Sequence, residues 1–531
     1  MSSFAHPKYP AAPRAGCDGA HVPVVIVGAG PVGLALAIDL AQRGVPTALL
    51  DDDDTVSVGS RAICWSRRSL QIFDQLGVGE RVTARGVRWS AGRVFCDDAE
   101  VFAFELAATD DHRRPAFVNL QQYHVEQMLV ERAGALAGCS LRWRHRCDSV
   151  VAQGDRIVLE VETPEGRYAL ACDWLVACDG ARSSVRASLA LEQRGQAFRD
   201  RFLIADIRMR CAVPTQRWFW FDPPFNRGQS ALLHRQADDV WRLDFQLGAD
   251  ADAEIERQPA NVAARVRAML GADAQFEIEW ASVYTFACRR MQHFRHGRTL
   301  FAGDAAHVVS PFGARGANGG IEDAFNLGWK LARVIHGESP QSLLDSYDAE
   351  RSAAADESIR HSTRATEFIT PKTAMSRLYR DAVLDLARRH PFARQWVNSG
   401  RLASAAVLAG SALNTADADF DDAGVAIGAV ATDVPLDDHR WLAEHLGGCF
   451  VLLMFGASIA PDAAARLYRE RGCDVVRVDV DVAARCYDAR PGTCYLVRPD
   501  QHVCARWRSF DRVAVEAAID LASGIDERWQ P

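Results

Sequence analysis

The stretch of sequence that decides the fold is Val24-Val25-Ile26-Val27-Gly28-Ala29-Gly30-Pro31-Val32-Gly33. It predicts a buried strand, a tight turn at Gly28 and a helix that begins against a pyrophosphate. Gly30 allows the backbone to approach the phosphates, and Gly33 allows the helix to pack closely on the sheet. Because the start of a helix favours negative charge, the stretch predicts a dinucleotide site on a parallel sheet.

A second apolar run extends this prediction. Ala48-Leu49-Leu50 ends at Asp51, 18 residues after Gly33, where an acid is expected to bind the hydroxyls of the adenosine ribose. The acidic run that follows, Asp52–Asp54, is interpreted as a solvated surface turn. A glycine loop alone marks NAD and FAD sites alike and can be a structural turn, but the strand before it and the acid after it favour a dinucleotide.

Two later apolar runs also end beside acids and favour FAD. Leu175–Cys178 leads into Asp179, and Thr299–Ala302 leads into Gly303-Asp304. Ligands of parallel sheets gather at the carboxyl ends of the strands, so Asp304 is placed to hold a polyol such as the ribityl chain of FAD. The loop Pro311–Gly320 then opens a helix over Ile321–Val334, whose first amides can stabilise negative charge on a reduced flavin.

Taken in this order, the motifs resemble those of the class A FAD-dependent aromatic hydroxylases, in particular the phenol hydroxylase and 3-(3-hydroxyphenyl)propionate hydroxylase group. The resemblance spans roughly residues 22–389. It implies FAD as cofactor, NADPH or NADH as reductant, and hydroxylation of a small phenolic aromatic by O2 through a C4a-hydroperoxyflavin. It also allows a homodimer.

The resemblance carries over residue by residue to the cofactor site. The positions expected at FAD are Gly28, Gly30, Pro31, Gly33, Asp51, Arg61, Gln122, Asp179, Gly303, Asp304, Pro311, Gly316, Ala317 and Asn318. The sequence departs from the family at Asp51-Asp52, where the family often has Glu-Arg, and at Ala314-Arg315 in the last loop. Arg315 either brings a cation close to the flavin and an anionic substrate or pairs on the surface.

The chain is expected to be an α/β protein in which a second domain interrupts the first. Residues 22–189 and 286–395 are predicted to form a Rossmann-like FAD-binding domain, because short apolar runs alternate with helical patterns. Residues 190–285 are predicted to insert a mixed β-sheet that binds substrate. The strands in this sheet are expected to form the wall that faces the flavin.

The two ends of the chain are expected to behave differently. Residues 1–21 are interpreted as a disordered tail and residues 396–424 as a linker. Residues 425–531 follow the order βαβ then ββα, which matches a thioredoxin-like domain. Gly456-Ala457-Ser458-Ile459 stands where the redox pair is expected, so this domain is predicted to lack redox cysteines.

The residues that bind substrate are harder to identify from the sequence than those that bind the cofactor. His234, Arg242, Asp244 and Gln246 have matching parity on their strands, but the pattern leaves open which face points inward. His234 is either a proton relay or a structural histidine, and Tyr284 either hydrogen-bonds a phenol or occupies an ordinary sheet position. The candidate catalytic residues are His234, Arg242, Tyr284 and Arg315. His307 is interpreted as a structural residue near the cofactor.

Composition excludes several classes of function. The net charge of −8 gives no electrostatic reason to expect nucleic acid or an anionic membrane as partner. Val22–Leu40 is apolar, but its glycines, its prolines and Asp39 indicate a strand-turn-helix rather than a membrane span. The 14 cysteines include no Cys-x-x-Cys pair, which indicates a reducing, cytoplasmic location and no metal site. A flavin oxidoreductase that does not insert oxygen and a hydroxylase of larger polycyclic aromatics remain alternatives.

Overall fold

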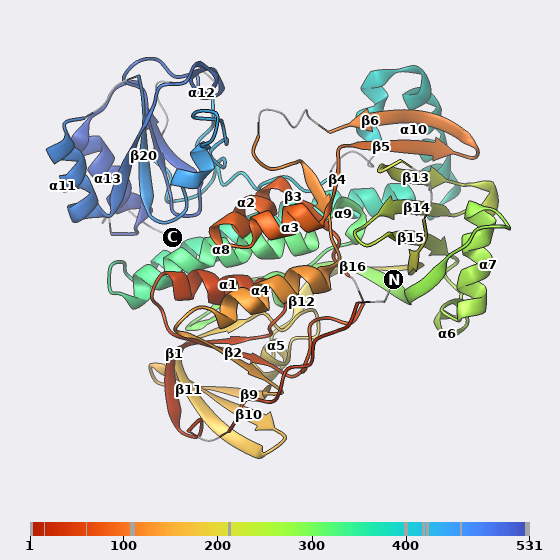
Figure 1. Cartoon of the computed structure of the whole chain (residues 1–531), viewed down its shortest axis with the longest axis horizontal. Helices are drawn as coiled ribbons and strands as arrows, with labels where there is room; N and C mark the ends of the chain where they lie inside the picture. The colour runs from red at the N-terminus through yellow and green to blue at the C-terminus, as the bar shows by residue number, and fades with distance from the viewer. Residues whose placement is uncertain are drawn as a thin grey trace.

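The computed structural model describes residues 4–14, 16–59, 61–106, 112–210, 214–397, 402–416, 420, 424–456 and 459–525. Figure 1 shows three sheet-containing regions arranged around a long helix, α8 (Gly316–Ile335). One sheet lies below this helix, a second lies to its right, and the C-terminal region lies at its upper left. Within the described part of the chain, no helix combines the length and apolarity needed to cross a bilayer.

The first sheet is built on parallel strands. Its main path runs β17-β18-β11-β1-β2-β8, and β9 and β10 extend β11 as an antiparallel hairpin. The strands are β1 (Ala20–Val27), β2 (Thr47–Asp51), β8 (Cys139–Trp143), β9 (Arg146–Gln153), β10 (Arg156–Thr163), β11 (Gly166–Ala177), β17 (Arg295–His296) and β18 (Thr299–Phe301). Because β1, β2, β11 and β18 run in parallel, their carboxyl ends meet at one edge of the sheet.

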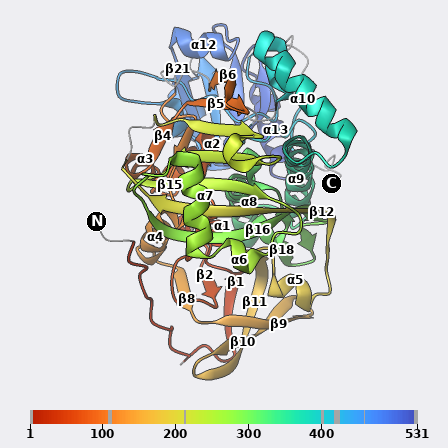
Figure 2. The same cartoon turned by 90° about the vertical axis from the view of Figure 1, so that its right-hand side faces the viewer.

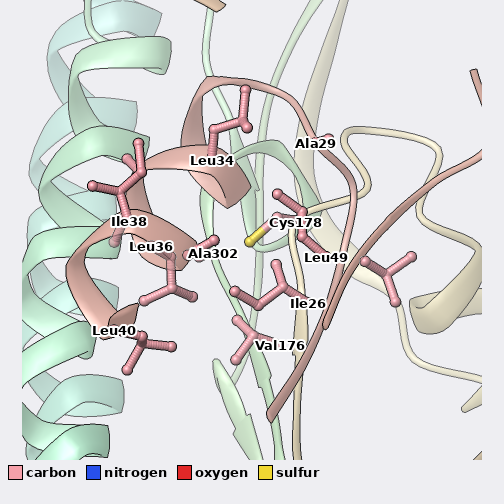
Figure 3. Close-up of a cluster of buried hydrophobic side chains, with 14 of the residues drawn as sticks. Ile26, Ala29, Leu34, Leu36, Ile38, Leu40, Leu49, Val176, Cys178 and Ala302 are labelled. Atoms are coloured by element: carbon pink, nitrogen blue, oxygen red, sulfur yellow. The ribbon is translucent and has the colours of Figure 1, made fainter. Parts of the chain in front are cut away.

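Helices α1 (Pro31–Gln42) and α4 (Gln122–Gly134) lie beside α8 over this sheet (Figure 1). Figure 3 shows Leu34 and Ile38 of α1 in one cluster with Ile26 and Val176 of the strands, and all four side chains are fully buried. The strands of a parallel sheet that helices cover have continuous apolar sequences, as Val24–Val27 has. Burying each such side chain stabilises the fold by about 1.5–3 kcal/mol.

The second sheet has the order β19-β16-β12-β15-β14-β13-β5-β6. Its strands are β5 (Ala91–Cys96), β6 (Ala99–Glu105), β12 (Gln193–Arg208), β13 (Arg217–Phe221), β14 (Ser230–Arg235), β15 (Val240–Leu247), β16 (Glu277–Met291) and β19 (His307–Val308). Helix α7 (Pro259–Leu270) packs on its outer face through Val262 and Val266 (Figure 2). The opposite face is turned toward the first sheet.

This second sheet is larger than the expected insert of residues 190–285. β5 pairs with β13 in parallel, Phe95 opposite Trp220, and β16 continues to Met291. The added hairpin β5–β6 covers the otherwise open edge of β13, whose unpaired backbone groups would be a liability. A pairing between segments more than 100 residues apart leaves no local pattern, so the sequence could not reveal it.

A third, short sheet connects the two. β7 (Phe117–Asn119) lies between β3 (Cys64–Ser66) and β4 (Val87–Trp89), and α2 (Arg67–Gln75) and α3 (Gly79–Arg85) follow β3. After α8 the chain forms two further long helices, α9 (Leu343–Ile369) and α10 (Ala374–Arg389), with Thr370-Pro371 between them.

The C-terminal region forms a separate four-stranded sheet with the order β21-β20-β22-β23. β20 is parallel to β21 and antiparallel to β22, and β22 is antiparallel to β23. Its elements are β20 (Phe450–Phe455), α11 (Pro461–Arg471), β21 (Cys473–Val478), α12 (Asp481–Cys486), β22 (Cys494–Val497), β23 (Val503–Trp507) and α13 (Arg512–Ala522). Of the segment expected in place of a redox pair, Ala457-Ser458 lies outside the described residues.

A buried ionic cluster joins this region to α8 and α9. Glu350 of α9 accepts hydrogen bonds from Lys330 of α8 at 2.6 Å and from Arg498, in the β22–β23 turn, at 2.6 and 3.0 Å. Arg498 also pairs with Asp500, and Asn326 donates to both Glu350 and Asp500 at 2.8 Å. These charged groups are at most 2% exposed, and we call Lys330, Glu350, Arg498, Asp500 and Asn326 the junction cluster.

The prediction of a disordered tail is wrong for residues 4–14. Phe4 stacks on Tyr123 with ring centroids 4.4 Å apart, and Tyr9 stacks on Trp143 at 4.7 Å. The Ala12 carbonyl oxygen lies 3.0 Å from Nε2 of His145. The proline- and alanine-rich composition of this segment indicated disorder, but Phe4 and Tyr9 within it pack on the first domain. In the expected linker, residues 402–416 form no helix or strand, but Leu402, Leu408 and Leu413 are buried.

Candidate FAD and substrate site

A cavity of about 980 Å³ lies between the carboxyl edge of the first sheet and the second sheet. Residues that the sequence predicts at FAD line one part of it, namely Gly28, Gly30, Pro31, Asp51, Arg61, Gln122, Asp179, Gly303, Asp304, Pro311, Gly316, Ala317 and Asn318. Gly33 is the remaining predicted residue, and it lies behind the loop. Side chains of the second sheet line the other part of the cavity. One continuous space therefore connects the predicted FAD residues with the second sheet.

The three glycines of the first loop have different roles. Gly28 has φ +104°, and a Cβ there would lie 2.5 Å from the Cys178 carbonyl oxygen. A Cβ at Gly33 would lie 2.0 Å from the Gly28 carbonyl oxygen. A Cβ at Gly30 would meet nothing within 4 Å, because the start of α1 faces open space. Gly28 and Gly33 therefore allow close backbone packing, and Gly30 leaves room for a phosphate at the helix start.

Asp51 holds the glycine loop to the end of β2. Its carboxylate accepts hydrogen bonds from the backbone N–H groups of Ala29 at 2.5 Å and Asp53 at 2.9 Å. Burial raises the pKa of Asp51 to about 6, although these two hydrogen bonds oppose the shift. Asp52 and Asp53 are exposed, as the surface-turn interpretation predicts.

The segment after β2 is fixed by the start of α4. Gln122 accepts a hydrogen bond from Ala62 N–H at 3.0 Å and donates to Glu126 at 2.7 Å. Glu126 in turn accepts from Ser57 N–H at 2.7 Å. The Gln-x-x-x-Glu pattern thus holds the loop that carries Arg61 against the cavity.

Two acids at strand ends face the cavity with spare hydrogen-bonding capacity. Asp179 accepts from the Ser184 hydroxyl and Val185 N–H with Oδ2, each at 3.1 Å, while its buried Oδ1 has no partner among the described residues. The Asp304 side chain is exposed to the cavity. The surrounding protein raises the pKa of Asp304 by desolvation.

His307 is structural, as its sequence context predicts. Its Nε2 lies 2.7 Å from Oδ2 of Asp323, which also accepts from Gly303 N–H at 2.9 Å. Arg351 donates to the other carboxylate oxygen at 2.7 Å. Against the effect of desolvation, His307 and Arg351 lower the pKa of Asp323 to about 2. This buried group supports the Gly303-Asp304 turn from behind.

The loop before α8 is held by Asn318. Its side-chain oxygen accepts from Ser66 N–H at 2.9 Å and Ser69 Oγ at 2.6 Å, and its amide donates to the Cys64 carbonyl at 2.9 Å and the Ala314 carbonyl at 2.6 Å. All the capacity of this side chain is therefore used within the protein. The backbone, and not the side chain, is what Asn318 offers the cavity.

Arg315 lies at the cavity and not on the surface. It is 9% exposed, lines the cavity and donates to the Leu402 carbonyl oxygen at 3.3 Å. Of the two alternatives for Arg315, its buried position therefore favours a cation at the cavity.

The second sheet presents a polar wall to the cavity. Ile204, Asp244 and Leu232 are register partners on β12, β15 and β14, and all three line it. Arg242 and His234 form the next pair along the strands and line it as well. The shared parity of His234, Arg242 and Asp244 is thus confirmed, and their face is the inner one.

The charges of this wall are unevenly balanced. Arg242 forms a bidentate ion pair with Asp206, at 2.9 and 2.8 Å, and donates to the Arg61 carbonyl at 3.2 Å. Burial, with Arg217 and Arg242, lowers the pKa of His234 well below its ordinary value, so this imidazole is neutral. Its Nδ1 lies 3.9 Å from Cys64 Sγ.

Two of the substrate-side candidates, Tyr284 and Gln246, lie outside the cavity lining. Tyr284 pairs with Phe202 farther along the sheet and is not among the cavity residues, so parity alone did not bring it to the site. Gln246 accepts from the Ser230 N–H and hydroxyl, each at 3.0 Å, and donates to Asp200 at 3.3 Å. Both side chains lie beyond the end of the cavity wall.

The sequence reasoning missed Arg217, Asp206 and Cys64. Arg217 begins β13, is 7% exposed, and shares its strand face with Phe219 and Phe221, which are buried. A charged residue in phase with buried aromatic residues was the available signal. Arg217 makes one hydrogen bond, to the Phe312 carbonyl at 3.4 Å, and no ion pair with any described residue.

The residues present fit an FAD molecule. Gly30 leaves open space at a helix start, Asp304 presents a carboxylate to the cavity, and Asp179 carries an orphaned oxygen atom. These are the donors and acceptors that a pyrophosphate and a polyol require. No group of metal-ligating side chains occurs among the described residues.

Comparisons with known proteins agree with this geometry. A family model described as an FAD binding domain matches residues 21–362. The 12-dehydrotetracycline 5-monooxygenase/anhydrotetracycline 6-monooxygenase of Streptomyces rimosus subsp. rimosus is 30% identical over 525 residues, covering 94% of this chain and 97% of that enzyme. The 3-(3-hydroxy-phenyl)propionate/3-hydroxycinnamic acid hydroxylase of Mycolicibacterium smegmatis is 30% identical over 380 residues, covering 71% of this chain and 66% of that enzyme.

Solved structures show the same fold. The flavin-dependent monooxygenase PieE, in complex with FAD and substrate, superposes with a TM-score of 0.80 at 22% identity, covering 95% of this chain and 98% of PieE. OxyS anhydrotetracycline hydroxylase from Streptomyces rimosus gives a TM-score of 0.73 at 27% identity, covering 95% of this chain and 99% of OxyS. The chain therefore belongs to the class A FAD-dependent aromatic hydroxylases, which are flavoprotein monooxygenases, and FAD is its cofactor.

Proposed function

We propose that this enzyme uses NADPH or NADH and O2 to hydroxylate a small phenolic aromatic. The observation that carries the proposal is the single cavity that joins the glycine loop to the polar wall of the second sheet. A ring placed in that cavity lies between the cofactor site and Asp244, Arg217 and Arg242. Buried polar groups at such a wall are suited to a ligand that carries a hydroxyl group.

We infer the following roles at the cofactor. The α1 start at Gly30 holds the pyrophosphate, Asp51 the adenosine ribose and Asp304 the ribityl chain. Arg61, Gln122 and Asp179 lie along the same side of the cavity, and the loop Pro311–Asn318 lies against the isoalloxazine. When bound, FAD accepts a hydride from NAD(P)H and activates O2. The protein's own part is to position the ring and to keep water out.

A second candidate substrate class is a larger polycyclic aromatic. The tetracycline monooxygenase aligns over 97% of its length, whereas the phenylpropionate hydroxylase aligns over 66%. The C-terminal region is thus shared with a relative whose name includes a polycyclic substrate. This observation favours testing both classes together.

The test is NAD(P)H oxidation by the yellow protein with monocyclic and polycyclic phenols, while O2 consumption and H2O2 release are followed. Substrate-stimulated oxidation with little peroxide and a hydroxylated product would support the proposal and identify the ring class. Oxidation that a phenol stimulates without any hydroxylated product would support an oxidoreductase that does not insert oxygen. Oxidation that no phenol stimulates would contradict the proposal.

We also propose that residues 425–531 form a thioredoxin-like domain without redox function. The strand order β21-β20-β22-β23, with β20 parallel to β21 and the other pairs antiparallel, supports this assignment. Cys486 and Cys494 are free thiols, and burial raises the pKa of Cys494 to about 11. A protonated thiol is a poor nucleophile, so this cysteine is unsuited to disulfide exchange.

A further inference from the structure

One carboxyl group in the cavity wall has no hydrogen-bond partner that the structure describes. Asp244 lies on β15 between Ile204 and Leu232 of the neighbouring strands, and it lines the cavity. Its Oδ1 atom is buried and receives no hydrogen bond. Leaving a buried acceptor unsatisfied costs about 1–3 kcal/mol, and more when the acceptor is charged. Such a group at a ligand cavity points to a ligand that brings the missing donor.

The other acid of the wall is already occupied. Asp206, on β12, accepts two hydrogen bonds from Arg242 and a third from Gln236 at 2.9 Å. Both of its oxygen atoms are used, and proton uptake would break a buried ion pair. Asp206 therefore holds Arg242 in place and is not available to a substrate.

The remaining titratable groups of the wall are poor proton acceptors. His234, on β14, faces Arg217 and Arg242, which together with burial lower its pKa well below the ordinary value. Charging this imidazole would place a third cation in the wall. Cys64, on β3, is a protonated thiol, because burial raises its pKa to about 11.

Asp244 differs from these groups in both charge and access. Burial raises its pKa to about 6, with Asp206 acting in the same direction, while Arg242 and Arg217 lower it. At neutral pH the carboxylate is charged, and its affinity for a proton is greater than that of an ordinary aspartate. A general base should be ionised at the working pH and still hold a proton well, and this group meets both conditions.

We propose that Asp244 is the base that accepts the proton of the substrate's aromatic hydroxyl, and that Arg217 stabilises the phenolate oxygen formed. This inference rests on the proposed function. Arg217 suits the second role because it lines the same cavity and makes one long hydrogen bond and no ion pair among the described residues. A buried guanidinium that forms no ion pair with any described carboxylate favours an anion supplied by the ligand.

The step is balanced in protons and charge. The phenolic O–H bond breaks, its proton forms a bond to the Asp244 carboxylate, and the electron pair stays on oxygen and is delocalised into the ring. One negative charge is lost at Asp244 and one is gained beside Arg217, so the net charge of the wall is unchanged. The ring becomes more nucleophilic at the moment when oxygen transfer requires it. The proton then returns to the hydroxylated product.

The first test compares wild type with Asp244→Asn, both loaded with FAD. With 3-(3-hydroxyphenyl)propionate and 1-naphthol as probes, kcat for product formation should fall by about a hundredfold to ten-thousandfold. In wild type, kcat should decrease as the pH falls below about 6, because protonated Asp244 cannot accept a proton. In the variant this decrease should disappear, and activity should instead rise toward the pKa of the free phenol.

The matched control is Asp200→Asn. Asp200 lies on β12 in the same sheet, is 7% exposed, and pairs with Lys372 and Gln246 away from the cavity. Its replacement should leave the shape of the pH profile unchanged, whatever it does to stability. A wild-type pH profile and kcat in Asp244→Asn would overturn the proposal.

A binding measurement separates this proposal from the proposed function. Each phenol is compared with its O-methyl ether, which lacks the proton, by titrating the flavin absorbance of the oxidised enzyme without NAD(P)H. Wild type should bind the phenol about tenfold more tightly than the ether or better, and Asp244→Asn should lose most of this preference. Equal preference in both proteins would overturn the role of Asp244 even if hydroxylation occurs. A preference lost in the variant, with no hydroxylation by wild type, would contradict only the proposed function.

Discussion

The molecule contains two buried clusters of charged side chains, and they differ in how their charges are balanced. In the junction cluster, every charged side chain has a partner of opposite charge. Lys330 and Arg498 both pair with Glu350, and Arg498 also pairs with Asp500. In the cavity wall, Arg242 and Asp206 are the one pair of this kind among the described residues. Asp244 has an oxygen atom that no described residue contacts by a hydrogen bond, and Arg217 has one long hydrogen bond.

This difference in pairing distinguishes charged groups that stabilise the fold from charged groups that are available to a ligand. A buried ion pair whose remaining donors and acceptors are satisfied is costly to break but offers nothing to a substrate. A buried charge left without a partner lowers the stability of the empty protein and recovers that loss when a ligand binds. The following experiments test whether the two clusters follow this rule.

The largest effect is expected from Arg498→Met. Removing this guanidinium leaves Glu350 and Asp500 buried with less positive charge, so the fold should lose about 3–5 kcal/mol of stability. Urea unfolding, followed by tryptophan fluorescence, measures the change. Arg490→Met is the control, because Arg490 is exposed in the same region and should change stability very little. Similar unfolding midpoints for both variants would contradict a structural role for the junction cluster.

A smaller, more selective effect is expected from Asp304→Ala. The carboxylate faces the cavity, so its loss should weaken FAD binding by about tenfold to a hundredfold while the protein still folds. The ratio of flavin to protein absorbance after gel filtration, together with circular dichroism, measures both properties. Asp155→Ala, at a side chain that is 98% exposed, is the matched control. Full retention of FAD by Asp304→Ala would refute the ribityl assignment.

Arg217→Met makes the same kind of change as Arg498→Met, a buried arginine to methionine, but in the cavity wall. Here stability should stay the same or rise by about 1 kcal/mol, because the side chain removed is a buried cation that forms no ion pair with any described residue. The affinity for a phenol should fall, as measured by flavin absorbance. If Arg217→Met were as destabilising as Arg498→Met, the distinction between the two clusters would fail.

The smallest effect is expected in the C-terminal region, from the double variant Cys486→Ser and Cys494→Ser. Cys486 is exposed and Cys494 is buried, and both are free thiols. Product formation and its coupling to NAD(P)H oxidation should remain within about twofold of wild type, since no disulfide chemistry is involved. A large loss of activity, with the unfolding midpoint unchanged, would contradict a domain without redox function.

Much of the cofactor side could be predicted because its signals are local. Gly28, Gly30 and Gly33 follow one another within a single strand-turn-helix. Gly28 and Gly33 are explained by the backbone they approach, and Gly30 by the open space at the helix start. Asp179 and Asp304 follow apolar strands, and parallel strands bring their carboxyl ends to one edge. Predicting these residues required no knowledge of which strands pair.

The substrate side could be predicted only in part. Parity correctly grouped His234, Arg242 and Asp244, but it could not exclude Tyr284, which shares the face and lies beyond the cavity. Arg217 was not identified from the sequence because its importance depends on which groups surround it in the folded protein. That is a property of the folded surroundings and not of the strand.

The sequence by itself thus determined the kind of domain, the cofactor and the edge of the sheet where chemistry occurs. These follow from short-range steric and periodic constraints that the chain carries in every conformation. Only the tertiary structure decided that residues 91–105 join the second sheet, that residues 4–14 dock on the first domain, and that Arg498 is paired while Asp244 has no partner among the described residues. Whether a charge is satisfied depends on partners from distant segments, and these meet only when the chain has folded.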